Sequence, residues 1–220
     1  MKNKYFLLTL ILAIAVSIFP QEVEGDFQIA RVKYSGGGDW YNDPSAEVNL
    51  LKFISKNTSI KTEPEYVFVD ISKEEIFLYP VLFITGHGNI VFNEEETVLL
   101  KTYLEAGGFL YIDDDYGLDK ALRREMKKVF PEKDFVELPF DHAIYNNVYK
   151  FDGPPKTHSH DEKPPRGYGL FLGERLSVFY TVESNPSDGW ADPQVHNDSE
   201  NKREEALKFG TNIIVYALTN

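Results

Sequence analysis

The chain of 220 residues contains no cysteine. It therefore has no disulfide framework, no lipid-modified cysteine and no thiol nucleophile, and its stability must come from the packing of its core. Positive charge is also scarce, because 23 Lys and Arg residues face 35 Asp and Glu residues and the formal net charge is −12. Nucleic-acid binding needs a basic surface, so this balance argues against a nucleic-acid partner and against adhesion to anionic membranes.

The sequence also lacks a hydrophobic run long enough for a comfortable membrane span. The apolar stretch at residues 5–19 is too short, and we expect no stable transmembrane anchor. Two lysines precede this stretch and polar residues follow it, a pattern that is typical of a secretory signal peptide. We expect residues 1–21 to be a signal peptide, cleaved somewhere within 17–25. Residues 26–220 should then form a single domain that is exported to the periplasm or the extracellular space.

Strand-like and helix-like patterns alternate from residue 27 onward. Apolar runs predict strands at residues 27–34, 66–71, 80–86, 109–113 and 135–139. Near-continuous apolar strands with helices between them indicate a parallel sheet that is covered on both faces. We therefore expect an α/β fold with a doubly wound, mostly parallel sheet.

Helix signals separate these strands. Asp43, followed by Pro44, is a candidate N-cap of the first helix. Asn93 and Glu96 form a capping-box pattern, and Gly107 would end the helix that they begin. Further helices are expected at residues 118–130 and 202–218.

The last third of the chain has a different texture. Residues 140–167 are rich in Pro, Gly, His and Asp and predict a long loop of functional character. The segment 167–182 predicts an added C-terminal hairpin with Gly173 in its turn. A polar loop should follow it, before the closing helix.

Polar residues follow three of the expected strands. In open α/β sheets, ligands bind beyond the carboxyl ends of the strands. The stretches SGGGDWYNDP, TGHGN and DDDYG should therefore meet at one edge of the sheet, although the first could also be only a glycine-rich turn and a helix cap. It is not a phosphate loop, because the Gly-Lys-Ser/Thr signature is missing. The expected ligand-binding residues are Gly37, Gly38, Asp39, Trp40, Gly86, His87, Gly88, Asn89, Asp114 and Tyr116.

Three consecutive aspartates close the fourth expected strand. Side chains alternate along a strand, so Asp113 and Asp115 should share one face and Asp114 should lie on the other. Asp115 or Asp119 could cap the following helix. Two close carboxylates raise one pKa unless a cation or a donor intervenes, and a carboxylate can act as nucleophile or general base. The candidate catalytic residues are Asp115, Asp113 and His87. The expected partners of the aspartates are His87, Arg123, Arg124 or a divalent metal ion.

A second polar cluster lies in the stretch PKTHSHDEKPPRGYG. A His-x-His pair on an extended segment points both imidazoles the same way, which suits a metal ion, although such loops are commonly only solvated. His142 and His196 are weaker candidates. A divalent metal is therefore a possible cofactor, and the candidate ligands are Asp113, Asp115, His158, His160 and Asp161.

Several motifs occur together and in order. ARVKYSGGGDWYNDP, FITGHGN, GGFLYIDDDYG, RREMKKVFP and HDEKPPRGYG resemble the bacterial family known as domain of unknown function 4159. The resemblance covers essentially all of the chain after the signal segment. The family name implies no activity.

A wider resemblance is to the class I glutamine amidotransferase-like fold, with its ThuA-like branch, which implies a flavodoxin-like sheet. In that group a sharp turn after a strand presents a cysteine nucleophile, and here Asp115 stands in its place. TGHGN resembles the turn that supplies oxyanion contacts. Glu183 and Ser184 follow the strand after which the group often has a histidine. The resemblance therefore implies the fold without glutaminase chemistry.

Three functions remain open from the sequence. The first is a non-enzymatic module that binds a small molecule or an envelope protein, favoured by the missing nucleophile. The second is a carboxylate- or metal-dependent hydrolase, favoured by the aspartates that face His87. The third is carbohydrate binding by Trp40, Tyr41 and Tyr116 beside aspartates.

Overall fold

A computed structural model describes residues 26–158 and 160–220 of the chain. The expected signal peptide and its cleavage region lie outside these residues. Within the described part, none of the helices combines the length and the apolar character that crossing a membrane would require.

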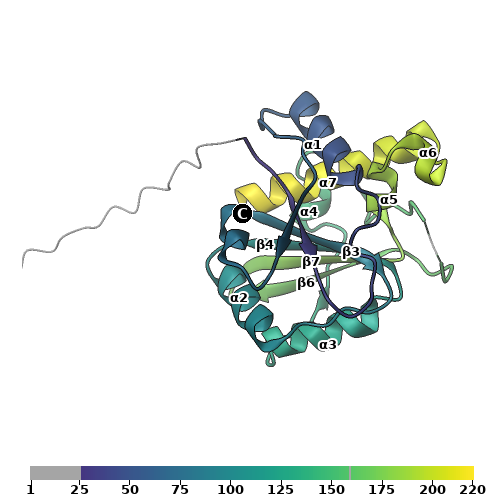
Figure 1. Cartoon of the computed structure of the whole chain (residues 1–220). Helices are drawn as coiled ribbons and strands as arrows, with labels where there is room; N and C mark the ends of the chain where they lie inside the picture. The colour runs from purple at the N-terminus through teal and green to yellow at the C-terminus, as the bar shows by residue number, and fades with distance from the viewer. Residues whose placement is uncertain (1–25, 159) are drawn as a thin grey trace, which may run out of the picture.

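Seven strands form one mixed sheet (Figure 1). In spatial order they are β2 (Val67–Asp70), β1 (Ala30–Lys33), β3 (Val81–His87), β4 (Phe109–Tyr116), β7 (Arg175–Val182), β6 (Arg166–Leu172) and β5 (Val136–Glu137). The pairings from β2 to β7 are all parallel, whereas β6 runs antiparallel to both of its neighbours. The expected α/β class with a mostly parallel sheet is thus confirmed.

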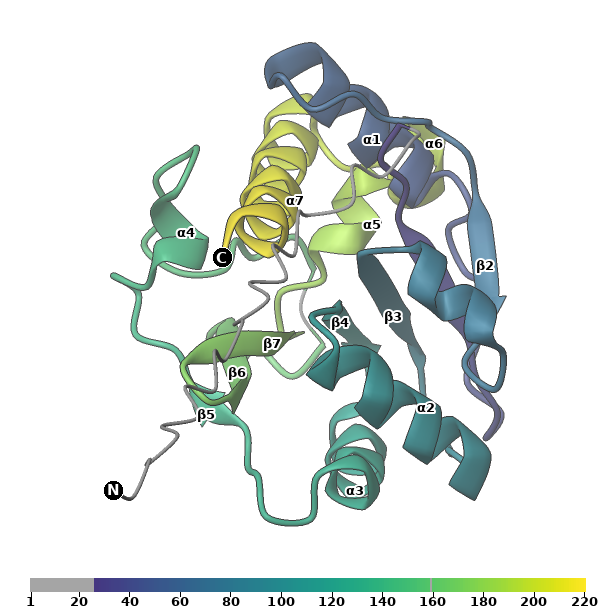
Figure 2. The same ribbon diagram turned by 90° about the vertical axis from the view of Figure 1, so that its left-hand side faces the viewer.

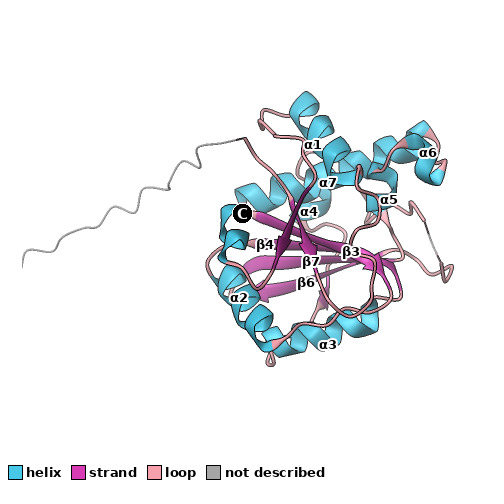
Figure 3. Ribbon diagram, in the orientation of Figure 1, coloured by secondary structure: helices cyan, strands magenta, loops and turns pink. Residues whose placement is uncertain are grey.

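Helices cover both faces of the sheet, as Figures 2 and 3 show. One face carries α2 (Glu94–Glu105) and α3 (Asp119–Val129), and the other carries α1 (Ala46–Asn57) and α7 (Glu200–Thr219). The shorter helical segments are η1 (Glu74–Leu78), α4 (Ala143–Asn146), α5 (Pro186–Trp190) and α6 (Pro193–His196).

The two apolar cores follow from the alternation of side chains along the central strands. Leu82 and Ile84 of β3 pack in the core under α2 and α3, whereas Val81 and Phe83 pack in the core under α1 and α7. Because both faces are covered, these strands read as continuous apolar runs.

The helix boundaries agree with some sequence signals and correct others. The capping box of α2 is present, since the Asn93 side chain accepts from the Glu96 N–H at 2.9 Å and Glu96 accepts from the Asn93 N–H at 2.7 Å. Asp43 is not the N-cap of α1, which is Ser45. Asp43 instead has a positive φ of 43° and directs its carboxylate to His196.

Two further expectations about the chain are wrong. The fourth strand does not end at Asp113, because β4 continues to Tyr116 and holds all three aspartates. The expected polar loop after β7 contains α5 and α6, each with a proline in its first turn, where the missing N–H costs nothing. Ser187 and Asp188 lie on α5, and His196 ends α6.

Candidate functional site

Asp113 is buried and fully hydrogen-bonded by the protein. Its Oδ1 accepts from the Thr181 hydroxyl at 2.7 Å, and its Oδ2 accepts from the Ser187 N–H at 3.0 Å and the Ser187 hydroxyl at 2.7 Å. Burial raises the pKa of Asp113 to about 7, although the donors from Ser187 and Thr181 oppose the shift. Asp113 therefore fastens β4 to β7 and α5, and both of its oxygens are already occupied.

Asp114 lies on the opposite face and caps α3. Its carboxylate accepts from the backbone N–H groups of Leu118 at 2.8 Å and Asp119 at 3.1 Å, and from the Tyr180 hydroxyl at 3.2 Å. Burial raises the pKa of Asp114 despite these donors. The helix is thus capped by Asp114 and not, as the sequence suggested, by Asp115 or Asp119.

Asp115 points to the mouth of the site. Its Oδ2 accepts from Asn42 Nδ2 at 2.6 Å, its Oδ1 accepts from Asn185 Nδ2 at 2.9 Å, and His87 Nδ1 lies 3.1 Å from Oδ2. Burial raises the pKa of Asp115 to about 7, the charge of Asp188 adds to the rise, and His87 opposes it. This carboxyl group can therefore exchange a proton near neutral pH.

His87 is held between two carboxylates. Its backbone N–H donates to Asp39 Oδ1 at 2.6 Å, and its Nδ1 lies 3.1 Å from both Asp39 Oδ2 and Asp115 Oδ2. Partial burial lowers the pKa of His87, but the charges of Asp115 and Asp39 outweigh it and the net shift is upward. About half of the side chain is exposed, so His87 can reach a ligand from solvent.

His160 lies close to His87 and Asp115. Its ring stands 4.5 Å from the Tyr116 ring, between centroids, and its Nε2 lies 3.4 Å from Asn185 Nδ2. One ligand atom from each of His87, Asp115 and His160 can be chosen so that all three lie within 4.8 Å of one another. We call these three residues the strand-edge group. A pocket of about 340 Å³ opens beside it and is lined in part by Asp115, Tyr116 and His160.

The glycines of the expected site have packing roles. A Cβ on Gly86 would come within 2.3 Å of the Tyr34 hydroxyl, and a Cβ on Gly38 would come within 2.8 Å of the His87 carbonyl. Gly37 and Gly88 have open space around them but positive φ values of 93° and 84°. These residues let the loops after β1 and β3 approach each other closely.

Other expected residues lie away from the pocket. Trp40 packs at 5.6 Å against the Phe68 ring. Asn89 donates to the Gly36 carbonyl and accepts from Arg124, so it ties the loops together.

The structure brings neither arginine to the strand-edge group. Arg123 pairs with Asp119 and Arg124 with Glu125, so neither neutralises the aspartates of β4 as expected.

The expected metal ligands of the His-x-His segment separate into two places. His160 joins His87 and Asp115, whereas His158 lies with Asp188 and His196. Asp161 is exposed and pairs with Lys163 at 2.9 Å. His158 and His160 nevertheless both line an open pocket of about 420 Å³, so the two places are neighbours.

Backbone strain accumulates around this edge. In the described residues, the non-glycine positions with positive φ are Asp43, Glu162, Glu183, Asn185 and Asn197. All five lie in the loops that contact or flank the strand-edge group or the residues His158, Asp188 and His196. Left-handed conformations of this kind are costly and tend to persist at functional sites.

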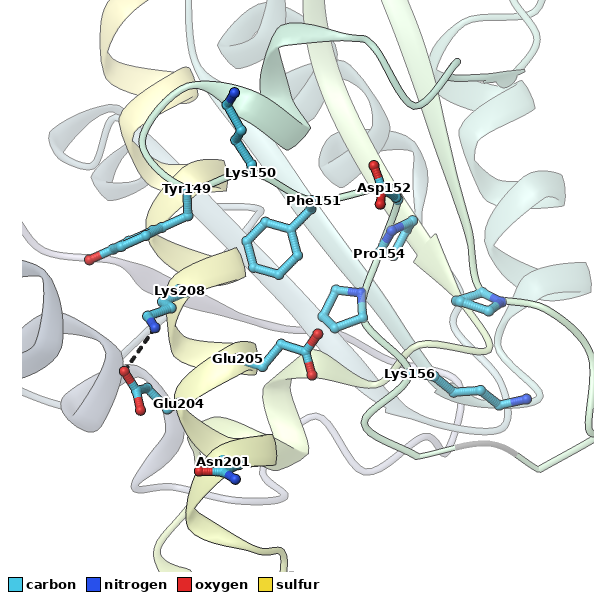
Figure 4. A pocket seen from close by; sticks show the side chains of 13 residues that line it. Tyr149, Lys150, Phe151, Asp152, Pro154, Lys156, Asn201, Glu204, Glu205 and Lys208 are labelled. Atoms are coloured by element: carbon cyan, nitrogen blue, oxygen red, sulfur yellow. Dashed lines mark ion pairs between the residues drawn. The ribbon is translucent and has the colours of Figure 1, made fainter.

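A wider hollow of about 800 Å³ lies elsewhere, between the loop 149–156 and α7 (Figure 4). Phe151 faces Glu205 across it, and Lys208 pairs with Glu204 at 2.8 Å. It contains none of the convergent His and Asp groups of the strand edge, so its size does not make it the better candidate.

Several residues of the site gave little signal in the sequence. Asn42, Asn185 and Asp188 reach it from a turn, a left-handed residue and a five-residue helix, none of which has a periodic pattern. Asn-Pro at 185–186 and Asp-Pro at 192–193 could have marked the helix starts.

The fold and the site define an α/β protein with a buried carboxylate and two histidines at the carboxyl edge of its sheet. A family model described as Domain of unknown function (DUF4159) matches residues 28–218, and the chain belongs to this family. A search of curated proteins found no match.

Proposed function

We propose that the chain is an exported, amidotransferase-like domain that acts as a metal-dependent hydrolase at its strand edge. The signal-like N-terminus and the ThuA-like motifs support the first part of this proposal. The chain has no cysteine, so any reaction must proceed without a thiol nucleophile. Asp115 stands where the similar fold group has its cysteine, and a carboxylate cannot form the thioester of glutaminase chemistry.

The convergence of His87, Asp115 and His160 within 4.8 Å carries the proposal. Two imidazoles and one carboxylate suit Zn²⁺ or a similar transition metal, and three protein ligands leave a position for water or substrate, as catalytic sites do. Such an ion lowers the pKa of a bound water and polarises a carbonyl or phosphoryl oxygen. The adjacent pocket of about 340 Å³ can admit a small molecule.

The surroundings of the group also favour a metal ion. Asp39 contacts the His87 ring, and Asn42 and Asn185 donate to the two oxygens of Asp115. Outer partners of this type orient metal ligands and are a regular part of metal sites. In the metal-free state the same contacts make His87 and Asp115 a proton-exchanging pair.

Metal binding and hydrolysis can be tested together. Chelator-treated protein is titrated with Zn²⁺ and Mn²⁺ by calorimetry, and p-nitrophenyl acetate, p-nitrophenyl phosphate and bis-p-nitrophenyl phosphate are then offered with and without the metal. We expect His160→Gln to abolish both binding at this group and turnover. His142→Gln, at the N-cap of α4, is the control and should retain both.

The other outcomes separate the competing functions. Binding without turnover of any ester would favour the non-enzymatic binding module. Ammonia release from glutamine that is lost in Asp115→Ala would contradict the proposed loss of glutaminase chemistry. Carbohydrate binding is not proposed, because Trp40 packs on Phe68 whereas Tyr116 stacks on His160, so the expected aromatic residues do not form one platform.

A further inference from the structure

We propose that His158, Asp188 and His196 bind a second divalent transition-metal ion, such as Zn²⁺, at a structural site. We call these residues the α5–α6 group, because Asp188 lies on α5 and His196 ends α6. The group shares no ligand with the strand-edge group, so this inference stands independently of the proposed function.

The three side chains lie close enough together to share one ion. His158 Nδ1 lies 2.6 Å from Asp188 Oδ2, and His196 Nε2 lies 3.9 Å from Asp188 Oδ1. One ligand atom from each residue can be chosen so that all lie within 4.8 Å of one another. The two imidazole rings are 5.1 Å apart and nearly perpendicular. The three residues come from three separate segments, so nothing in the local chain alone requires them to meet.

A buried oxygen in the group has no partner. The Asp188 side chain is only 2% exposed, and its Oδ1 makes no hydrogen bond, while His196 Nε2 lies 3.9 Å from it. A buried carboxylate oxygen without a partner is unfavourable and rare in folded proteins. A metal ion between Asp188 and the two histidines would satisfy it.

Two further carboxylates contact the histidines. Asp198 Oδ1 lies 3.1 Å from His158 Nε2, and Asp43 Oδ2 lies 2.9 Å from His196 Nε2. An Nε2–H bond from His158 to Asp198 leaves the Nδ1 lone pair free for a metal, which is the usual carboxylate–histidine–metal arrangement. Asp43 is the nearest candidate for a fourth ligand, and four protein ligands would close the site as in structural zinc centres.

The charge of the region also fits a divalent cation. Asp43, Asp188 and Asp198 bring three largely buried carboxylates together, and Lys202 contributes one positive charge at 3.0 Å from Asp198. With neutral histidines the sum is −2, which one divalent ion would cancel. Protonation of both histidines would cancel it too, so the experiment must distinguish a metal from two protons.

An ion could enter from solvent. The open pocket of about 420 Å³ is lined by Lys156, Thr157, His158, His160 and Lys202. Once bound, the ion would tie α5, α6 and the segment before β6 to one another, beside the residues that hold Asp113 and Asp115.

The test counts ions in single-site variants. Chelator-treated protein comprising residues 26–220 is titrated with Zn²⁺ by calorimetry, and its metal content is measured after gel filtration. We expect His160→Gln to retain one tightly bound ion and His196→Gln and His158→Gln each to lose one relative to the parent. Circular dichroism and His142→Gln serve as controls for folding and for unrelated histidines.

Co²⁺ gives a spectroscopic readout of the same site. In the His160→Gln background, we expect intense visible absorption bands of tetrahedral Co²⁺ that disappear on adding Asp188→Asn. The inference is overturned if folded His160→Gln binds no Zn²⁺, or if folded His196→Gln binds as many ions as the parent. If His160→Gln alone loses all binding, the proposed function stands and this inference fails. If His196→Gln alone loses all binding, this inference stands and the proposed strand-edge metal site fails.

Discussion

Two buried charge clusters of this protein differ in how their charge is satisfied. Arg31 on β1 is fully buried and pairs with Glu47 on α1 through two hydrogen bonds of 2.6 and 2.7 Å, and its guanidinium lies 5.3 Å from the Tyr66 and Phe83 rings. The α5–α6 group, together with the neighbouring Asp43 and Asp198, instead carries excess negative charge, and Asp188 Oδ1 and Asp198 Oδ2 have no hydrogen-bond partner.

The difference separates a cluster whose charges are balanced within the protein from one whose charges are not. Arg31 and Glu47 sum to zero charge and use protein partners throughout, including the carbonyls of Trp40 and Asn42. The Arg31 cluster also holds the turn that delivers Asp43 to His196 of the α5–α6 group and Asn42 to Asp115 of the strand-edge group. A neutral ion pair thus positions two sets of candidate metal ligands.

The largest effect should come from breaking the Arg31 cluster. Glu47→Ala leaves Arg31 buried without a counter-charge, and we expect a loss of about 3–5 kcal/mol of unfolding free energy. Urea denaturation at neutral pH measures it. The double variant Arg31→Met, Glu47→Leu should recover most of the loss. A cost below about 1 kcal/mol for Glu47→Ala would contradict the dependence of buried Arg31 on Glu47.

The next effect concerns pH. Burial raises the pKa of Asp113 from its ordinary value of 3.8 to about 7, so the folded state binds this proton more tightly than the unfolded state. The stability that this group contributes is complete below pH 3.8 and is lost as pH rises through about 7. Between about pH 5 and 7, we expect chelator-treated protein to lose on the order of 1 kcal/mol per pH unit relative to Asp113→Asn. Parallel pH profiles of the two proteins would contradict the shift.

A smaller effect of opposite sign should come from the α5–α6 group. In chelator, Asp188→Asn removes one of three crowded carboxylates and keeps an acceptor for His158, so we expect a gain of about 0.5–2 kcal/mol, together with loss of Zn²⁺ stabilisation. Thermal melts with and without Zn²⁺ measure both. If metal-free Asp188→Asn were as damaging as Glu47→Ala, the two clusters would not differ as described.

The smallest effect should come from an ion pair at the surface. Arg166 and Glu137 join β6 to β5, and each side chain is more than 40% exposed. Water screens such pairs, so Arg166→Gln should change the unfolding free energy by about 0.5 kcal/mol or less in urea denaturation. A loss comparable to that of Glu47→Ala would mean that exposure does not govern these pairs.

Local patterns in the sequence carry much of the architecture. The apolar runs predict β1 to β4, and Asn93 with Glu96 predicts the start of α2, because these signals depend on neighbours in the chain. The sequence predicts β7 only as one arm of an added hairpin, whereas it pairs in parallel with β4 in the middle of the sheet. The strand-edge rule likewise brings Asp39, His87 and Asp115 into contact.

The remainder depends on partners far away in the sequence. The sequence around Asp113 does not predict its contact with Ser187, and the sequence around His158 does not predict its contact with His196. These contacts form only when β7 pairs with β4 and α5 follows it. The role of Asp114 as the cap of α3 was hidden for another reason, because the cap comes from the preceding strand rather than from the N-cap position.

The position of β7 has a consequence for the order of folding. This strand lies between β4 and β6, so the middle of the sheet is completed by residues 175–182, which follow β4 by about sixty residues. Such long-range parallel pairing is slow to form. A nascent chain can assemble β1 to β4 with their helices early, but the buried aspartates receive Thr181, Asn185 and Ser187 only late in synthesis. We therefore expect the site to be among the last of the described parts of the molecule to form.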